Sequence, residues 1–157
     1  MADLGGGGMS GATTAPRVPR RTGSGFGRLL VAVYGVLALA ALARSAYQIT
    51  QRFSEAPLPY SLSALAAVVY AVATVALARG TRPWRAVAWG AVVVEAVGVL
   101  AVGTDSLLQP QAYPDATVWS VYGQGYGFVP LVLPFVGIWW LWRTRSGGEP
   151  GTESEAS

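Results

Sequence analysis

The sequence contains no cysteine and no histidine, and charged residues are sparse. Without cysteine there is no disulfide and no thiol nucleophile, and without histidine the commonest metal ligand and general base are missing. Charged residues make up 12% of the 157 residues, whereas hydrophobic residues make up 52%. This balance favours a polytopic membrane protein and excludes most familiar catalytic constellations. We therefore expect no catalytic residue, no cofactor and no metal site.

Lysine is absent too, so all 11 basic residues are arginines. A sequence pI near 9.6 would suit a nucleic-acid partner. The arginines, however, flank apolar runs instead of gathering in one polar domain, which indicates a lipid bilayer as the partner and no nucleic acid.

Four apolar segments are predicted to cross the membrane as helices, at residues 27–48, 61–79, 84–103 and 122–142. Pro57 and Pro59 predict a short external loop at 50–60, and residues 79–85 predict a tight turn. The sequence thus predicts an all-α membrane protein. Its single domain, residues 26–143, is expected to be an antiparallel bundle of four transmembrane helices.

Both ends of the chain are rich in small and polar residues, so residues 1–25 and 144–157 are predicted to be disordered tails. Met9 is an alternative start that changes nothing else. The first span has an alternative interpretation as a signal peptide, because arginines precede it and residues 41–43 resemble a cleavage site. The uninterrupted helix pattern beyond that site and the three later spans favour a retained membrane helix.

The arginines predict the orientation of the bundle through the excess of positive charge on cytoplasmic loops. With the N-terminus inside, the outer side carries only Arg44 and Arg52. The inner segments carry the other nine arginines: Arg17, Arg20, Arg21, Arg28, Arg79, Arg82, Arg85, Arg143 and Arg145. Both termini are therefore expected to be cytoplasmic.

The connection that follows the third span, residues 105–127, is predicted to lie outside and has no basic residue. Asp115 after Pro114 is expected to cap a short interfacial helix. Gly123 and Gly127 form a GxxxG pair, a weak helix-packing signal. The side chains predicted to form an outer partner surface at headgroup level are Tyr113, Asp115, Trp119, Tyr122 and Tyr126.

The third span carries one charge, Glu95, near its middle. Small residues at helical spacing, Ala88, Ala91 and Gly98, lie on the same predicted face, which we expect to pack against other helices. A carboxylate that faced lipid would cost several kcal/mol, so Glu95 needs neighbours inside a bundle.

Three other residues are predicted to reach the level of Glu95. Counting inward at ~1.5 Å per residue puts Glu95 about 12 Å deep, Tyr70 about 13 Å and Pro130 about 10 to 12 Å. Arg44 is only about 6 Å deep, but its Cα–Cβ bond tilts toward the bilayer centre, so its side chain is expected to reach Glu95. Pro130 and Pro134 have no backbone N–H, so they leave two helix carbonyls without hydrogen-bond donors. Arg44 and Tyr70 are the expected donors to these carbonyls.

The segments APLPYSLSALAAVVY from Ala56 and YPDATVWSVYGQGYGFVPLVLPFVGIWWLW from Tyr113 resemble small four-span integral membrane proteins of actinobacteria. The similarity covers about residues 26–143 and omits both tails. It implies a four-span topology and a bacterial plasma membrane, and it implies no activity and no site residue.

Two functions remain open at this point. The first is a non-catalytic accessory or interaction subunit that binds a membrane-protein partner through its outer loop and lipid-facing surfaces. The second is a small oligomeric transporter or ligand-binding protein that uses the Glu95, Arg44 and Tyr70 cluster. The same cluster can also be purely structural, holding the helices together.

Overall fold

The computed structural model describes residues 22–147, and this part of the chain is helical without any strand. It contains α1 (Thr22–Arg52), α2 (Pro57–Arg79), α3 (Arg82–Leu108), η1 (Pro110–Ala112), η2 (Ser120–Tyr126), α4 (Val129–Arg143) and η3 (Thr144–Gly147). Three helices, α1 to α3, are long and apolar enough to cross a membrane, and a fourth crossing exists if η2 and α4, bent by 99°, form one span. The all-α class is confirmed. The rest of the predicted tails, residues 1–21 and 148–157, lies outside the described residues.

The helices extend beyond their predicted ends. α1 begins at Thr22, inside the predicted tail, and α3 continues to Leu108. α2 begins at Pro57. Proline is well suited to the first turn of a helix, because the backbone N–H that it lacks would have no partner within the helix there. The predicted loop at 50–60 therefore shrinks to residues 53–56. At the other end of α2 the turn lies where it was predicted, with Gly80 in the left-handed conformation at φ 59°.

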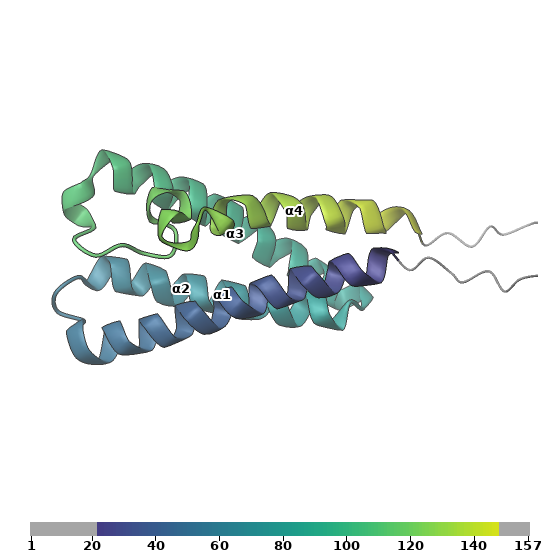
Figure 1. Ribbon diagram of the computed structural model, residues 1–157, viewed down its shortest axis with the longest axis horizontal. Helices are drawn as coiled ribbons and strands as arrows, with labels where there is room; N and C mark the ends of the chain where they lie inside the picture. The colour runs from purple at the N-terminus through teal and green to yellow at the C-terminus, as the bar shows by residue number, and fades with distance from the viewer. Residues whose placement is uncertain (1–21, 148–157) are drawn as a thin grey trace, which may run out of the picture.

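Neighbouring helices run antiparallel, with α1 packed along α2, α2 against α3, and α3 against both α4 and η2 (Figure 1). The predicted inward face of α3 is confirmed, because Ala88, Ala91 and Glu95 are buried. The bulkier side chains of Val93 and Val97 point outward, at 45% and 61% exposure. α1 lies at the edge of the bundle, where 28% of its apolar segment is buried compared with 44% for α2.

The last apolar segment was predicted to be one helix over residues 122–142, but the structure divides it into η2 and α4. α4 has 15 residues, or about 22 Å, and is shorter than the ~30 Å hydrocarbon core. Pro130 lies in its first turn, so it begins the helix instead of kinking it, and only Pro134 is interior. Gly123 and Gly127 have φ values of 80° and 63°, so they make turns instead of a GxxxG helix contact.

The chain between α3 and α4 folds back into the bundle. Val92 of α3 lies beside Gly137 of α4. From this level toward the end of α3, α3 extends for about 24 Å, whereas α4 extends only about 12 Å to its first residue, Val129. Residues 113–128 occupy the space beside α3 that α4 does not reach. A Cβ built on Gly98 would lie 2.7 Å from the Trp119 ring, and one on Gly103 would lie 2.4 Å from Tyr122, so glycine lets these rings contact α3. We call residues 113–128 the re-entrant segment.

Both ends of the described chain and the α2–α3 turn lie at the same end of the bundle (Figure 1). The described arginines at this arginine-rich end are Arg28, Arg79, Arg82, Arg85, Arg143 and Arg145. Only Arg44 and Arg52 lie toward the opposite, arginine-poor end. Arg85 donates to the carbonyl of Leu141 at 2.9 Å, which satisfies an acceptor in the last turn of α4.

Candidate functional site

Glu95 is completely buried in the middle of α3. Its Oε2 accepts a hydrogen bond of 2.6 Å from the Tyr34 hydroxyl on α1. Its Oε1 is buried and has no hydrogen-bond partner in the described part of the chain. The expectation that the acid faces the bundle is therefore confirmed, whereas its main partner is a tyrosine that the sequence analysis did not select.

Two further aromatic residues complete the surroundings of this acid. The Tyr70 ring on α2 lies 6.2 Å from the Tyr34 ring between centroids. The Trp119 indole in the re-entrant segment donates a hydrogen bond of 3.0 Å to the Tyr70 hydroxyl. We call Glu95, Tyr34, Tyr70 and Trp119 the Glu95 cluster, to which α1, α2, α3 and the re-entrant segment each contribute one residue.

The expected pairing of Arg44 with Glu95 is wrong. Arg44 donates to the backbone carbonyl of Ala116 at 2.8 Å, and the ion pair found among residues 22–147 joins Arg52 and Glu55 instead. α3 extends five residues beyond its predicted end, so Glu95 lies about 20 Å from that end instead of about 12 Å. The backbone near Ala116 is not helical, so its carbonyl has no N–H partner from a helical turn, and the Arg44 side chain supplies the donor instead.

Pro130 is fully buried, as expected, but for a different reason. It packs against Gly123, on which a Cβ would come within 2.7 Å of the proline ring. No described hydrogen bond connects Pro130, or a carbonyl freed by it, to Arg44 or Tyr70. Of the four predicted cluster members, the structure therefore places only Glu95 and Tyr70 in the Glu95 cluster.

The predicted outer partner surface is largely folded against the bundle. Trp119 is 1% exposed. The Tyr113 hydroxyl donates to Asp105 at 2.8 Å, and the Tyr122 hydroxyl lies 3.0 Å from Thr104 Oγ1. Tyr126 is partly buried against the core. Burial, together with the hydrogen bond to Asp105, raises the pKa of Tyr113 to about 12.

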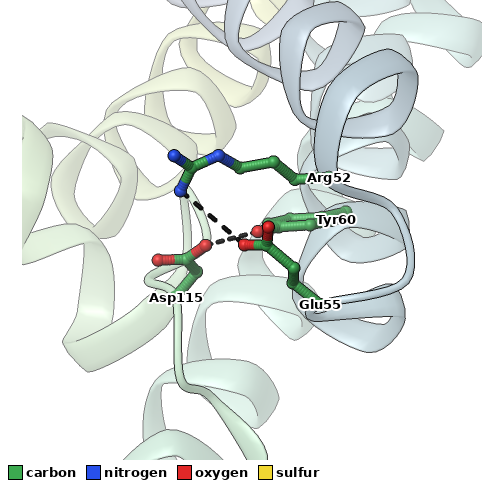
Figure 2. Close-up of polar contacts among 4 residues, drawn as sticks. All are labelled: Arg52, Glu55, Tyr60 and Asp115. Carbon is green, nitrogen blue, oxygen red and sulfur yellow. Dashed lines mark hydrogen bonds and ion pairs between the residues drawn. The ribbon is translucent and has the colours of Figure 1, made fainter.

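Asp115 does not cap a helix, since the next helical residue is Ser120. It instead accepts a hydrogen bond from the Tyr60 hydroxyl, and this bond fastens the start of the re-entrant segment to α2 (Figure 2). The exposed pair of Arg52 and Glu55, 3.7 Å apart, lies beside it at the arginine-poor end (Figure 2).

Backbone strain is concentrated in the re-entrant segment next to the Glu95 cluster. Val121 and Tyr122 have positive φ values of 49° and 58°, which branched and bulky residues rarely adopt. Reciprocal bonds of 2.9 Å between Thr117 and Ser120 hold the preceding turn, and Ser106 accepts from the Val121 amide at 2.8 Å. Such strain persists only where the surroundings fix it, so the position of Trp119 is closely determined.

The chemistry available at the Glu95 cluster is that of a carboxyl group, two phenols and an indole N–H. These groups can hold a proton or a small cation. The described residues contain no group of three potential metal ligands. Comparisons of the chain with protein-family models, curated proteins and solved structures found no match.

Proposed function

We propose that the chain is a four-span plasma-membrane protein that acts as a non-catalytic accessory or interaction subunit of a membrane complex. The apolar helices support the membrane location, with η2 and α4 as a bent fourth crossing. The arginine bias supports an arginine-rich, cytoplasmic end that holds both termini. The resemblance to actinobacterial four-span proteins supports a bacterial plasma membrane.

One observation carries the proposed interaction role, an apolar groove between α1 and α4. Its volume is about 320 Å³ and its lining is almost entirely apolar. The lining residues are Phe26, Leu29, Leu30, Val33, Gly127, Phe128, Val129, Val132, Leu133 and Val136. α1 packs extensively against α2 alone, so the four helices leave this side of the bundle open.

We infer that the occupant of the groove is a transmembrane helix of a partner protein. At the arginine-rich end α1 and α4 meet through the Phe26 and Trp139 rings, 5.9 Å apart and edge to face. Beyond this contact Val33 of α1 and Val132 of α4 both line the groove. Helices in lipid associate by filling such grooves with side chains, because lipid tails supply no hydrophobic driving force. A second copy of this chain is the alternative occupant.

Groove-filling substitutions test this role. A tagged full-length chain is purified from its native membrane in mild detergent as wild type, Val33→Trp, Val132→Trp and, as a control on the lipid-facing side of α3, Val97→Trp. We expect a stoichiometric partner with wild type and V97W, and its loss with both groove variants. A partner kept by V33W and V132W, or the absence of any partner from wild type, would contradict the proposal. A homo-oligomer lost only in the groove variants would identify a second copy as the occupant.

The second candidate function is a small oligomeric transporter or ligand-binding protein. The observation in its favour is the fully buried Glu95, whose Oε1 has no hydrogen-bond partner among residues 22–147. A substrate-dependent rise in the melting temperature of the wild type, absent in Glu95→Gln, would favour this function over the accessory role.

A further inference from the structure

Polar side chains continue from the Glu95 cluster toward the arginine-poor end, along the interface of α1 and α2. Ser45 and Gln48 follow Tyr34 at spacings that keep them on the same face of α1. Ser63 precedes Tyr70 by two helical turns on the facing side of α2. All three are buried, with exposures of 4%, 7% and 0%. We call Ser45, Gln48 and Ser63 the polar path.

The polar path contains the same kind of unpaired atom as the Glu95 cluster. Ser45 Oγ, Gln48 Oε1 and Ser63 Oγ are buried and have no hydrogen-bond partner within the described chain, like Glu95 Oε1. Buried polar atoms without protein partners are the sites at which internal water binds. Between Tyr34 and Ser45 the buried residues of α1 are Leu37, Ala38 and Ala41, so two of the three have small side chains.

Tyr70 connects the polar path to the acid. Its hydroxyl accepts the hydrogen bond from Trp119, which leaves its own proton available as a donor. The titratable groups around Glu95 are Tyr34 from α1 and Tyr70 from α2, with Tyr126 of η2 near Tyr70. α4 carries no titratable side chain before Arg143. Within residues 22–147, therefore, no cation offsets a charge on Glu95, and the Tyr34 hydroxyl is the one hydrogen-bond donor that stabilises it.

We propose that Glu95 is a proton-binding site that exchanges with water at the arginine-poor end through the polar path. A hydrated proton binds to Oε1, converts the carboxylate into a neutral acid, and leaves as a hydrated proton by the same route. The step changes the charge of the site by one and needs no co-reactant. Protonation also removes the cost of a buried carboxylate that has one hydrogen-bond donor. The proposal is independent of the α1/α4 groove.

Infrared difference spectroscopy on the full chain in lipid nanodiscs tests the site. Titration with pH should reveal a carboxylic-acid C=O band that is absent in Glu95→Gln. Tyr34→Phe keeps the carboxyl group and removes its donor, so it should shift the same band and identify it even where Glu95→Gln fails to fold. Titration spectra in which neither substitution alters a carboxylic-acid band would overturn the proposal.

Hydrogen–deuterium exchange of the same band tests the polar path. In Ser45→Val with Ser63→Val, the downshift of the band in D₂O should be slower by roughly tenfold, because the path has lost its hydroxyls. Ser61→Val is the matched control, since Ser61 lies on the exposed face of α2 and bonds only to the Pro57 carbonyl. Equal exchange rates in wild type and the double variant would show that protons reach Glu95 by another route.

Discussion

The arginine-rich and arginine-poor halves of the bundle place their polar groups in opposite ways. In the arginine-rich half, the charged side chains stay at the rim, where Arg79 covers the Trp84 ring at 4.3 Å and Arg85 binds the end of α4. In the arginine-poor half, polar groups lie inside the bundle, from Gln48 and Ser63 down to Glu95. Part of this difference follows from the backbone, because regular helices satisfy their own peptide groups, whereas the re-entrant segment takes partners from Arg44 and Ser106.

The re-entrant segment accounts for two of the polar side chains in this half. Its peptide groups take partners from side chains, as Ala116 does from Arg44 and Val121 from Ser106. The apolar groove runs along α1 and α4 and reaches Gly127 and Phe128 of the re-entrant segment. Partner binding is therefore proposed on this lateral face of the bundle, whereas proton exchange is proposed inside its arginine-poor half.

The largest expected effect is the presence or absence of thiol labelling, which reports which half of the bundle faces the outside of the cell. Single cysteines replace Thr81, in the α2–α3 turn, and Gln111, in η1, both of which are exposed in this cysteine-free chain. An impermeant thiol reagent added to intact cells should label only the cysteine at position 111, because the arginine-rich end is proposed to be cytoplasmic. Labelling at position 81 alone would reverse the orientation, and labelling at both would contradict a fixed topology.

The next largest effect tests how strongly the re-entrant segment stabilises the arginine-poor half. Trp119→Ala removes a fully buried indole and its bond to Tyr70, and should lower the free energy of unfolding by about 3 to 5 kcal/mol. Trp142→Ala at the other end, where the side chain is 68% exposed, should stay within about 0.5 kcal/mol. Denaturation in detergent micelles measures both. Similar losses would mean that the two halves are not different in packing.

The sequence predicted the regular parts of this molecule and missed the irregular one. Helical periodicity and apolar length identified α1, α2 and α3, because those signals are local. Trp119 was assigned to the membrane surface because aromatic residues at headgroup level and buried ones look alike in sequence. Its burial depends on Gly98 of α3, against which the indole packs, and this pairing between distant segments has no periodic signal.

The prediction of the Glu95 partner failed for a related reason. The inward face of α3 was predicted correctly from small residues, but the depth of Glu95 rested on a helix end that lies five residues further along the chain. Tyr34 was treated as part of an apolar run, although a phenol is a hydrogen-bond donor that lipid-facing positions disfavour. A search for buried donors on the neighbouring helices, instead of for charges alone, would have found it.

A double-mutant cycle distinguishes the observed partner of Glu95 from the predicted one, with a smaller expected effect. Tyr34→Phe should cost about 1 to 2 kcal/mol, and its effect should disappear largely in the Glu95→Leu background, because leucine removes the acceptor of the one hydrogen bond that the two groups share. Arg44→Leu and Glu95→Leu should instead add within about 0.5 kcal/mol. Thermal unfolding of the single and double variants measures the coupling. Strong coupling of Arg44 with Glu95 would contradict the arrangement described here.

The smallest effects concern the arginine-poor end, where two polar contacts lie side by side but should differ in energy (Figure 2). Arg52 and Glu55 are 3.7 Å apart with side chains 52% and 58% exposed, so Glu55→Gln should change stability by less than about 0.5 kcal/mol. Tyr60 is fully buried and binds Asp115, so Tyr60→Phe should cost about 1 to 2 kcal/mol.

The two substitutions should also differ in where they act. Because the Tyr60 bond fastens the start of the re-entrant segment, Tyr60→Phe should speed hydrogen exchange of the backbone amides near Asp115 and leave those of the α2–α3 turn unchanged. Glu55→Gln should change neither region, which makes it the control for altered charge at this end. Faster exchange throughout the bundle in Tyr60→Phe would mean that the bond stabilises the whole fold, and the two halves would then open as one unit.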